Sequence, residues 1–170
     1  MIFAKYTYRS GRNDDSDALI ALLGSCFAEY ENCVLDVDGE IPELRAIADA
    51  FTAWGGEFRV AERDGRVVAC VGFARHEGGG RGHYELEKLY AYSDERGAAG
   101  PAGPLVDWVE EAVVARGGTT IDLWSDTRFT RAHRFYEKRG YQKSGETREL
   151  FDKSDTIEFR FVKRLGSTPA

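Results

Sequence analysis

Apolar residues recur along the chain with two periods, and these periods predict its helices and strands. Four segments repeat apolar residues at steps of three and four, which is typical of helices with one buried face. A polar cluster at residues 13–16 precedes the first segment, and glycines at 55–56, 117–118 and 140 end the other three. The apolar positions of the four helices are Leu19, Leu22, Leu23, Cys26, Phe27 and Tyr30; Leu44, Ile47, Ala48 and Phe51; Leu105, Trp108, Val109, Ala112 and Val113; and Phe129, Ala132, Phe135 and Tyr136.

Seven shorter segments have the β-branched, aromatic or alternating pattern of strands. They cover residues 4–8, 58–62, 66–76, 84–92, 119–124, 141–150 and 156–162. Asp64-Gly65 separates the second from the third and is a strong hairpin signal. The resulting order, β-α-α-β-β-β-α-β-α-β-β, predicts an α/β domain with a single mixed β-sheet of about seven strands flanked on both faces by about four helices.

Length and charge narrow the class of protein further. The 170 residues correspond to one domain, so we expect residues 1–165 to form it and residues 166–170 to be a flexible tail. The 23 basic and 29 acidic residues give a net charge of −6 without a basic stripe, so no nucleic-acid partner is expected. No apolar stretch approaches the roughly 18 residues of a membrane span, and no signal peptide is visible. We therefore expect no membrane partner and a cytoplasmic location.

Cysteines and acidic residues give no strong indication of a metal. The three cysteines, Cys26, Cys33 and Cys70, are odd in number and lack a CxxC spacing, which argues against both a disulfide framework and a zinc site. Residues 36–40 resemble a fragment of a calcium loop but lack the full ligand spacing. We expect no metal. The acidic loop is interpreted as a solvated surface, with a rim that attracts a cationic substrate as the alternative.

The most informative segment is residues 85–105, which is predicted to run strand, small-residue loop, helix. Glycine and alanine let the backbone approach a ligand closely, and the first turn of a helix binds anions through its free N–H groups and dipole. Arg96 at the entrance of the loop could add a charge-assisted hydrogen bond to a phosphate. The residues alone support an anion site and an ordinary turn equally.

Two motifs in this part of the chain resemble the GNAT superfamily of acyltransferases. Leu89-Tyr90-Ala91, followed five residues later by Arg96-Gly97, resembles the first family motif. Residues 132–141, AHRFYEKRGY, resemble the second, an alanine followed by Tyr-Glu-Lys-x-Gly-Phe. The resemblance is strong over residues 66–145. Two departures are present: Gly100-Pro101-Ala102 comes one residue late, and Phe129 stands where the family often has asparagine.

The resemblance implies a GNAT fold with two splayed parallel central strands, and acetyl-CoA as co-substrate. It implies that the pantetheine arm lies along the edge of the first splayed strand, where a backbone N–H polarises the thioester carbonyl. The pyrophosphate would lie on the glycine-rich loop. The implied acetyl-CoA contacts are Leu89, Tyr90, Ala91, Arg96, Gly97, Ala98, Ala99, Gly100, Ala102, Thr127 and Phe129.

The resemblance also implies catalytic roles. Tyr136 would protonate the leaving thiolate; the alternative is an aromatic residue packed in the core. Glu85 lies where some family members have a catalytic glutamate, and Glu87 shares its strand face. Either could take the proton of the amine, bind a cation without proton transfer, or be a half-exposed carboxylate. His83 is a third candidate.

The activity implied is an N-acetyltransferase that moves an acetyl group to the primary amine of a small molecule or peptide by direct attack in a ternary complex. The alternative is a non-catalytic module that binds an acyl-CoA. A homodimer is common in the family and is a further expectation.

Overall fold

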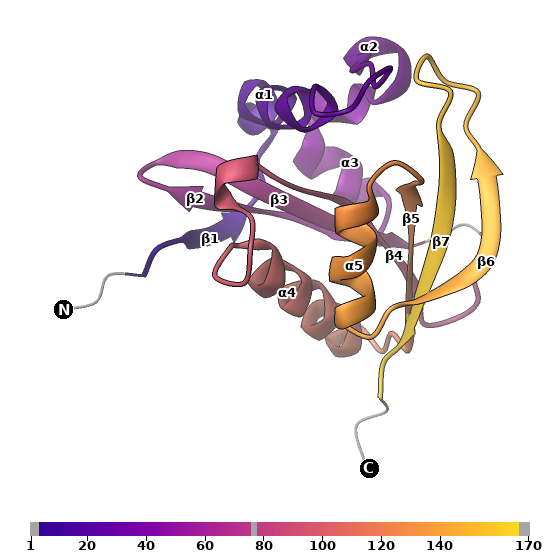
Figure 1. The fold of residues 1–170 in the computed structure, drawn as a ribbon. Coiled ribbons are helices and arrows are strands. Elements are labelled where there is room, and N and C mark those ends of the chain that lie inside the picture. Colours follow the sequence, from indigo (N-terminus) through magenta and orange to yellow (C-terminus); the bar gives the residue numbers. More distant parts are fainter. Residues whose placement is uncertain (1–3, 76–77, 167–170) are drawn as a thin grey trace.

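One seven-stranded sheet runs through the computed structural model, which describes residues 4–75 and 78–166 (Figure 1). Its strand order is β1-β2-β3-β4-β5-β7-β6, and β4 and β5 form the parallel pair between antiparallel neighbours. The predicted mixed sheet is confirmed. The strands are β1 (Thr7–Ser10), β2 (Glu57–Arg63), β3 (Arg66–Arg75), β4 (His83–Ala91), β5 (Thr120–Asp126), β6 (Gln142–Glu149) and β7 (Ile157–Arg164).

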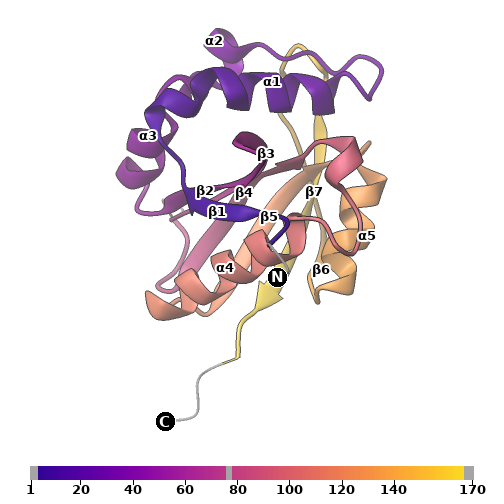
Figure 2. The ribbon, with the colours of Figure 1, turned by 90° about the vertical axis from the view of Figure 1, so that its left-hand side faces the viewer.

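Helices cover both faces of the sheet (Figure 2). One face packs against α1 (Ser16–Phe27) and α3 (Ile47–Ala53), and the short α2 (Val37–Glu40) lies between them in sequence. The other face packs against α4 (Ala102–Ala115) and α5 (Thr130–Lys138). Short 3₁₀ turns are η1 (Asn13–Asp15), η2 (Pro42–Arg45) and η3 (Ser93–Glu95). No helix within the described ranges is long and apolar enough to cross a lipid bilayer.

The second predicted helix differs from the observed structure. The periodicity predicts one helix that contains Leu44, Ile47, Ala48 and Phe51. The chain instead forms η2, leaves helical geometry at Ala46 with φ −149° and ψ 62°, and continues as α3. Both pieces still bury their apolar residues in the same core, Leu44 from η2 and Phe51 from α3. The periodicity identified the buried side chains but not the backbone break between them.

Two predicted features extend beyond the described residues. The strand predicted over 66–76 ends at Arg75, and His76 lies outside the described part of the chain. Of the predicted flexible tail 166–170, the structure describes Gly166 alone. The tail therefore stays a prediction.

A bulge in β4 separates it from β5. Opposite β3, Glu87 pairs with Gly72 and Tyr90 with Cys70, so Lys88 and Leu89 together face one residue. Lys88 has φ +54°, a conformation that a β-bulge accommodates. Against β5, β4 pairs from His83 to Glu85 and no further. Beyond Glu85 the two parallel strands diverge, as the resemblance to the GNAT superfamily implied.

We expect Gly72→Ala to destabilise the fold. A Cβ at position 72 would lie 2.3 Å from the Phe51 ring and 2.8 Å from the Phe58 ring, and both rings are buried in one cluster. Overpacking of this kind costs about 1–3 kcal/mol. Urea denaturation followed by circular dichroism should show a lower midpoint. Gly80→Ala is the control, because a Cβ there meets no atom within 4 Å; equal midpoints for the two variants would contradict the packing argument.

Candidate active site

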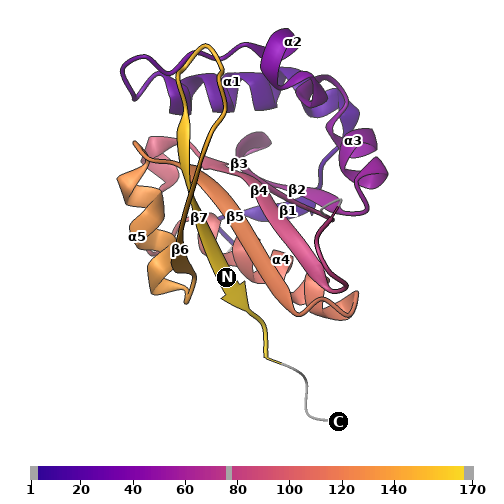
Figure 3. The same cartoon turned by 90° about the vertical axis from the view of Figure 1, so that its right-hand side faces the viewer.

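A cavity of about 610 Å³ opens where β4 and β5 diverge. The two strands contribute its floor, α5 contributes one wall, and the segment after α1 and the β6–β7 hairpin form its mouth. Figure 3 shows the β6–β7 hairpin rising beside α1 and α2. Cavities of this size commonly hold small molecules and are lined by apolar groups with a few polar ones.

Six of the predicted site residues line this cavity. They are the catalytic candidates Glu85, Glu87 and Tyr136 and the predicted acetyl-CoA contacts Leu89, Tyr90 and Phe129. Thr127 instead borders a separate cavity of about 220 Å³. Ala91, Arg96, Gly97, Ala98, Ala99, Gly100 and Ala102 belong to the end of β4, the loop after it and the start of α4, outside the lining of the larger cavity. The roles of all these residues remain predictions.

Glu85 lies at the last paired position of β4, opposite Asp122 of β5. Burial, together with the negative charges of Glu87 and Asp122, raises the pKa of Glu85 to about 8. Asp122 is 3% exposed, and its carboxylate lies 3.0 Å from His83 Nε2 and 2.9 Å from Arg160 Nε. A carboxylate with a pKa near the working pH can both accept and release a proton.

Tyr136 of α5 lines the cavity and is also part of the core. It is 6% exposed, and its ring centroid lies 5.7–5.9 Å from those of Phe135, Tyr141 and Phe161. Burial raises the pKa of Tyr136, so its hydroxyl stays protonated at neutral pH. Core packing and a proton-donating role, which the sequence analysis treated as alternatives, are therefore compatible.

Two features of the glycine-rich loop bear on anion binding: one residue has a backbone conformation that favours glycine, and one backbone N–H already donates a hydrogen bond within the loop. Gly97 has φ +119°, and the N–H of Gly100 donates to the carbonyl of Gly97. Arg96 points toward α1: its Nε donates to Ala91 O at 3.0 Å, and its two terminal nitrogens donate to the Glu29 carboxylate at 2.7 and 2.6 Å. Arg96 thus ties the end of β4 to the end of α1.

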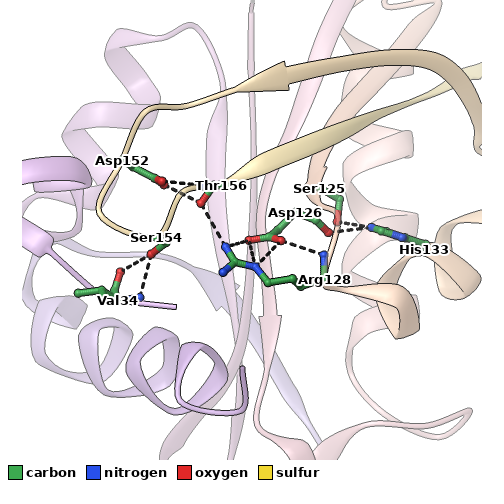
Figure 4. A network of polar contacts seen from close by, with 8 residues as sticks. All are labelled: Val34, Ser125, Asp126, Arg128, His133, Asp152, Ser154 and Thr156. Carbon is green, nitrogen blue, oxygen red and sulfur yellow. Dashed lines mark hydrogen bonds and ion pairs between the residues drawn. The ribbon is translucent and has the colours of Figure 1, made fainter. Parts of the chain in front are cut away.

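Hydrogen bonds connect three segments around the mouth of the cavity (Figure 4). Arg128, after β5, donates to both carboxylate oxygens of Asp126, at 2.9 and 2.7 Å. In the β6–β7 hairpin, Asp152 accepts from the N–H and hydroxyl of Thr156. Ser154 Oγ accepts from the N–H of Val34 at 2.8 Å, which attaches the hairpin to the segment after α1. These bonds fix the shape of the mouth.

His133 of α5 lies within hydrogen-bond distance of the end of β5. Its Nε2 lies 3.0 Å from the carbonyl of Asp126 and 3.2 Å from Ser125 Oγ (Figure 4). Burial is the largest influence on this imidazole and lowers its pKa, so His133 is neutral at pH 7. A neutral ring fits a structural hydrogen bond between α5 and β5.

The acidic loop after α1 is paired with cations and backbone groups. Asp36 lies 2.5 Å from Lys153, Asp38 lies 3.2 Å from Arg45, and Glu43 lies 2.5 Å from Lys88. Within residues 4–75 and 78–166, no three His, Cys, Asp or Glu side chains are arranged to hold a metal ion. Asp36 thus joins this segment to the β6–β7 hairpin and Glu43 joins it to β4, contacts that the sequence alone did not indicate.

Sequence reasoning missed the contribution of the C-terminal hairpin and of Trp124. Arg148, Leu150, Phe151 and Glu158 come from the hairpin and line the cavity. One signal was present: Leu150-Phe151 is an apolar pair beside a predicted turn, where polar residues are usual.

The mixed sheet with a cavity between two diverging parallel strands is the arrangement that the GNAT resemblance implied. Comparisons with known proteins agree. The sequence profile of the acetyltransferase (GNAT) family matches residues 18–141. The chain belongs to this family. A search of curated proteins returned no match.

Solved structures share the fold at low sequence identity. An acetyltransferase from Streptococcus agalactiae is 19% identical with a TM-score of 0.79, over 96% of this chain and 100% of that one. A GNAT-family acetyltransferase from Staphylococcus aureus is 21% identical with a TM-score of 0.79, over 95% and 99%. A putative acetyltransferase from Salmonella typhimurium, solved with acetyl-CoA, is 16% identical with a TM-score of 0.71, over 98% and 97%.

The raised pKa of Glu85 predicts that stability falls as pH rises. Between the unfolded pKa of about 4.3 and the folded value of about 8, the native state binds more protons at this group than the unfolded state does. The contribution of Glu85 is therefore fully present below pH 4 and is lost as pH rises through 8. Glu85→Gln should be more stable than the parent at pH 9, by at least about 1 kcal/mol, and equally stable at pH 4.

Urea denaturation at pH 4, 6, 7.5 and 9 measures this difference. The control is Glu111→Gln, since Glu111 lies exposed on α4. If the difference in free energy of unfolding between Glu85→Gln and the parent does not change with pH, the pKa of Glu85 is not raised in the folded protein.

Proposed function

We propose that this chain is an acetyl-CoA-dependent N-acetyltransferase that transfers the acetyl group to a primary amine by direct attack in a ternary complex. The observation that carries the proposal is the divergence of β4 and β5 into a cavity lined by both Glu85 and Tyr136. Glu85 can accept a proton in its ionised form, which becomes populated as the pH approaches 8, and Tyr136 keeps a hydroxyl proton beside it. An aminolysis needs both.

The acceptor amine must first lose a proton before it can attack. A lysine-like amine has a pKa of about 10.4, so it arrives as an ammonium ion. Glu87 and the ionised form of Glu85, which becomes populated as the pH approaches 8, attract that ion, and ionised Glu85 takes one of its protons. The free amine then forms the C–N bond at the thioester carbonyl. A backbone N–H on the open edge of β4, near Leu89, stabilises the oxyanion.

The second half of the reaction breaks the C–S bond. The electron pair goes to sulfur, and the thiolate takes the hydroxyl proton of Tyr136. The nitrogen loses its second proton as the intermediate collapses, and this proton restores the hydroxyl of Tyr136. The products are the acetylated amine and the free thiol, and the proton held by Glu85 leaves to solvent. Cys33 also lines the cavity, but burial raises the pKa of its thiol, which favours direct transfer over an acyl-cysteine intermediate.

Acetyl-CoA as the donor is supported by family membership and by the similar structure that carries it. The open edge of β4 offers backbone groups to the amides of the pantetheine arm, as an added strand would. The loop over residues 96–102 and the first turn of α4 would take the pyrophosphate. A small-molecule or peptide amine as acceptor, and a homodimer as the assembly, complete the proposal.

Tyr136→Phe should lower the turnover number at least about tenfold while the affinity for acetyl-CoA changes little. The substitution removes the proton donor and keeps the ring that packs in the core. Thiol release and calorimetric titration with acetyl-CoA measure the two quantities. Tyr141→Phe is the matched control, because Tyr141 is a neighbouring buried tyrosine outside the cavity lining. An unchanged rate in Tyr136→Phe would remove the assigned role.

Arg96→Ala should weaken acetyl-CoA binding by about tenfold if Arg96 contacts the pyrophosphate. Because Arg96 also holds Glu29, the matched variant is Glu29→Ala, which removes the ion pair and keeps the guanidinium. Equal losses in the two variants would mean that Arg96 acts by anchoring α1. Binding of acetyl-CoA without turnover on any amine would favour the non-catalytic module, and absence of binding would exclude both functions.

A further inference from the structure

A residue with a strained backbone lies in β4, just beyond the point where this strand leaves β5. Among the described residues, five other than glycine have a positive φ, and Lys88, with φ +54°, is the only one of these within a strand. The left-handed region disfavours side chains other than those of asparagine and aspartate. Such conformations persist only where the surrounding contacts hold them, and they concentrate at functional sites.

Two contacts hold Lys88, one at its backbone and one at its side chain. Buried Cys70 of β3 donates its S–H to the carbonyl oxygen of Lys88, with 3.2 Å between sulfur and oxygen. Burial raises the pKa of the Cys70 thiol, so the thiol keeps the proton that it donates. On the side-chain end, Lys88 Nζ lies 2.5 Å from a carboxylate oxygen of Glu43.

Glu43 is a rigidly placed partner, because the turn η2 that carries it is anchored on both sides. Pro42 restricts the backbone at the start of the turn, and Leu44, directly after Glu43, is fully buried in the core. The side chains of Lys88 and Glu43 are only 12% and 14% exposed. Glu87 is the other carboxylate near Lys88 Nζ, but it lies 3.8 Å away. The Lys88–Glu43 ion pair is thus the main connection between η2 and the bulge.

The peptide group between Lys88 and Leu89 connects these contacts to the cavity. This peptide bond is trans, so the carbonyl of Lys88 and the N–H of Leu89 point in opposite directions. Since the carbonyl points toward Cys70 of β3, the N–H points away from Cys70. β4 does not pair with β5 beyond Glu85, and both Lys88 and Leu89 line the cavity. Whatever fixes the conformation of Lys88 therefore fixes the direction of the Leu89 N–H.

We propose that Lys88 and Glu43 are positioning residues for acetyl transfer: their ion pair holds the β4 bulge so that the N–H of Leu89 faces the thioester carbonyl. The inference rests on the N-acetyltransferase function and adds two residues that act on the reaction through the backbone of β4. A donor that is already fixed stabilises the developing oxyanion without reorganisation during the reaction.

The first experiment breaks the ion pair from either side, with Lys88→Met and Glu43→Gln. Thiol release from acetyl-CoA is measured with phenethylamine, spermidine and a serine tripeptide as acceptors, and the acceptor with the highest parent rate is kept. Each variant should lower kcat at least about tenfold, because small misplacements of a reacting geometry have effects of this size. The affinity for acetyl-CoA, measured by calorimetry, should change less than kcat. Arg45→Met is the matched control, because it breaks the exposed Arg45–Asp38 pair of the same segment; its kcat should equal that of the parent.

The two substitutions remove opposite charges, which separates positioning from a direct electrostatic effect. Lys88→Met makes the surroundings of the cavity more negative, and Glu43→Gln makes them less negative. Positioning lowers kcat in both variants, each measured at the plateau of its own pH profile. Changes of kcat in opposite directions would overturn the inference. A rise in the KM for the acceptor in Lys88→Met with kcat unchanged would also overturn it, since Lys88 would then bind the acceptor.

The double variant Lys88→Met/Glu43→Gln separates positioning from a loss of stability. Removing one partner of a shielded ion pair leaves an uncompensated charge, whereas removing both does not. Urea denaturation should therefore give the double variant a midpoint closer to that of the parent than either single variant has. Its kcat should nevertheless stay at least about tenfold below that of the parent. Recovery of kcat together with stability would show that the pair only stabilises the fold, and would overturn the inference.

Nuclear magnetic resonance tests the bulge without turnover. In Glu43→Gln the amide signals of Lys88 and Leu89 should move, although Glu43 is distant from them in the sequence, and in Arg45→Met they should not. Unchanged signals in Glu43→Gln would overturn the inference whatever the activity. Absence of thiol release by the parent with every acceptor would instead overturn the N-acetyltransferase function, and the amide signals then decide whether the ion pair holds the bulge.

Discussion

The separation of β4 from β5 is the constraint on which the rest of the site depends. A β-bulge bends its strand and can carry it away from a neighbouring strand. The bulge at Lys88 and Leu89 supplies that bend. β4 consequently remains paired with β3 while its other edge is open beyond Glu85, and the cavity lies in the opening.

The cavity is therefore built from two kinds of structure. Its inner end consists of strand residues whose positions follow from sheet register, such as Glu85 opposite Asp122. Its mouth consists of loops that are held by side-chain bonds, such as Ser154 to Val34 and Lys153 to Asp36. The register fixes the inner carboxylates regardless of the loops. The loops depend on several polar contacts acting together.

This difference explains what could be predicted from the sequence. Strand and helix periodicity identified the elements. The resemblance to a family predicted site residues such as Glu85 and Tyr136, and the structure brings these two to one cavity. The break at Ala46 and the orientation of Arg96 toward Glu29 depend on contacts between distant segments. The position of Phe151 at the mouth depends on the contact between the hairpin tip and the segment after α1. The Ser154–Val34 hydrogen bond that makes this contact joins residues 120 positions apart in the chain. No local pattern encodes such a contact.

The exposed tip of the β6–β7 hairpin has a consequence for how this protein can diverge. Phe151 is 87% exposed and has φ +53°, so its side chain contributes little to the folded core, and glycine, asparagine or aspartate would suit its backbone. Surface substitutions of this kind change folding stability by less than about 0.5 kcal/mol. Descendants of one ancestral gene can therefore exchange residues at this tip, and so reshape the lining of the cavity, while the buried strands stay the same.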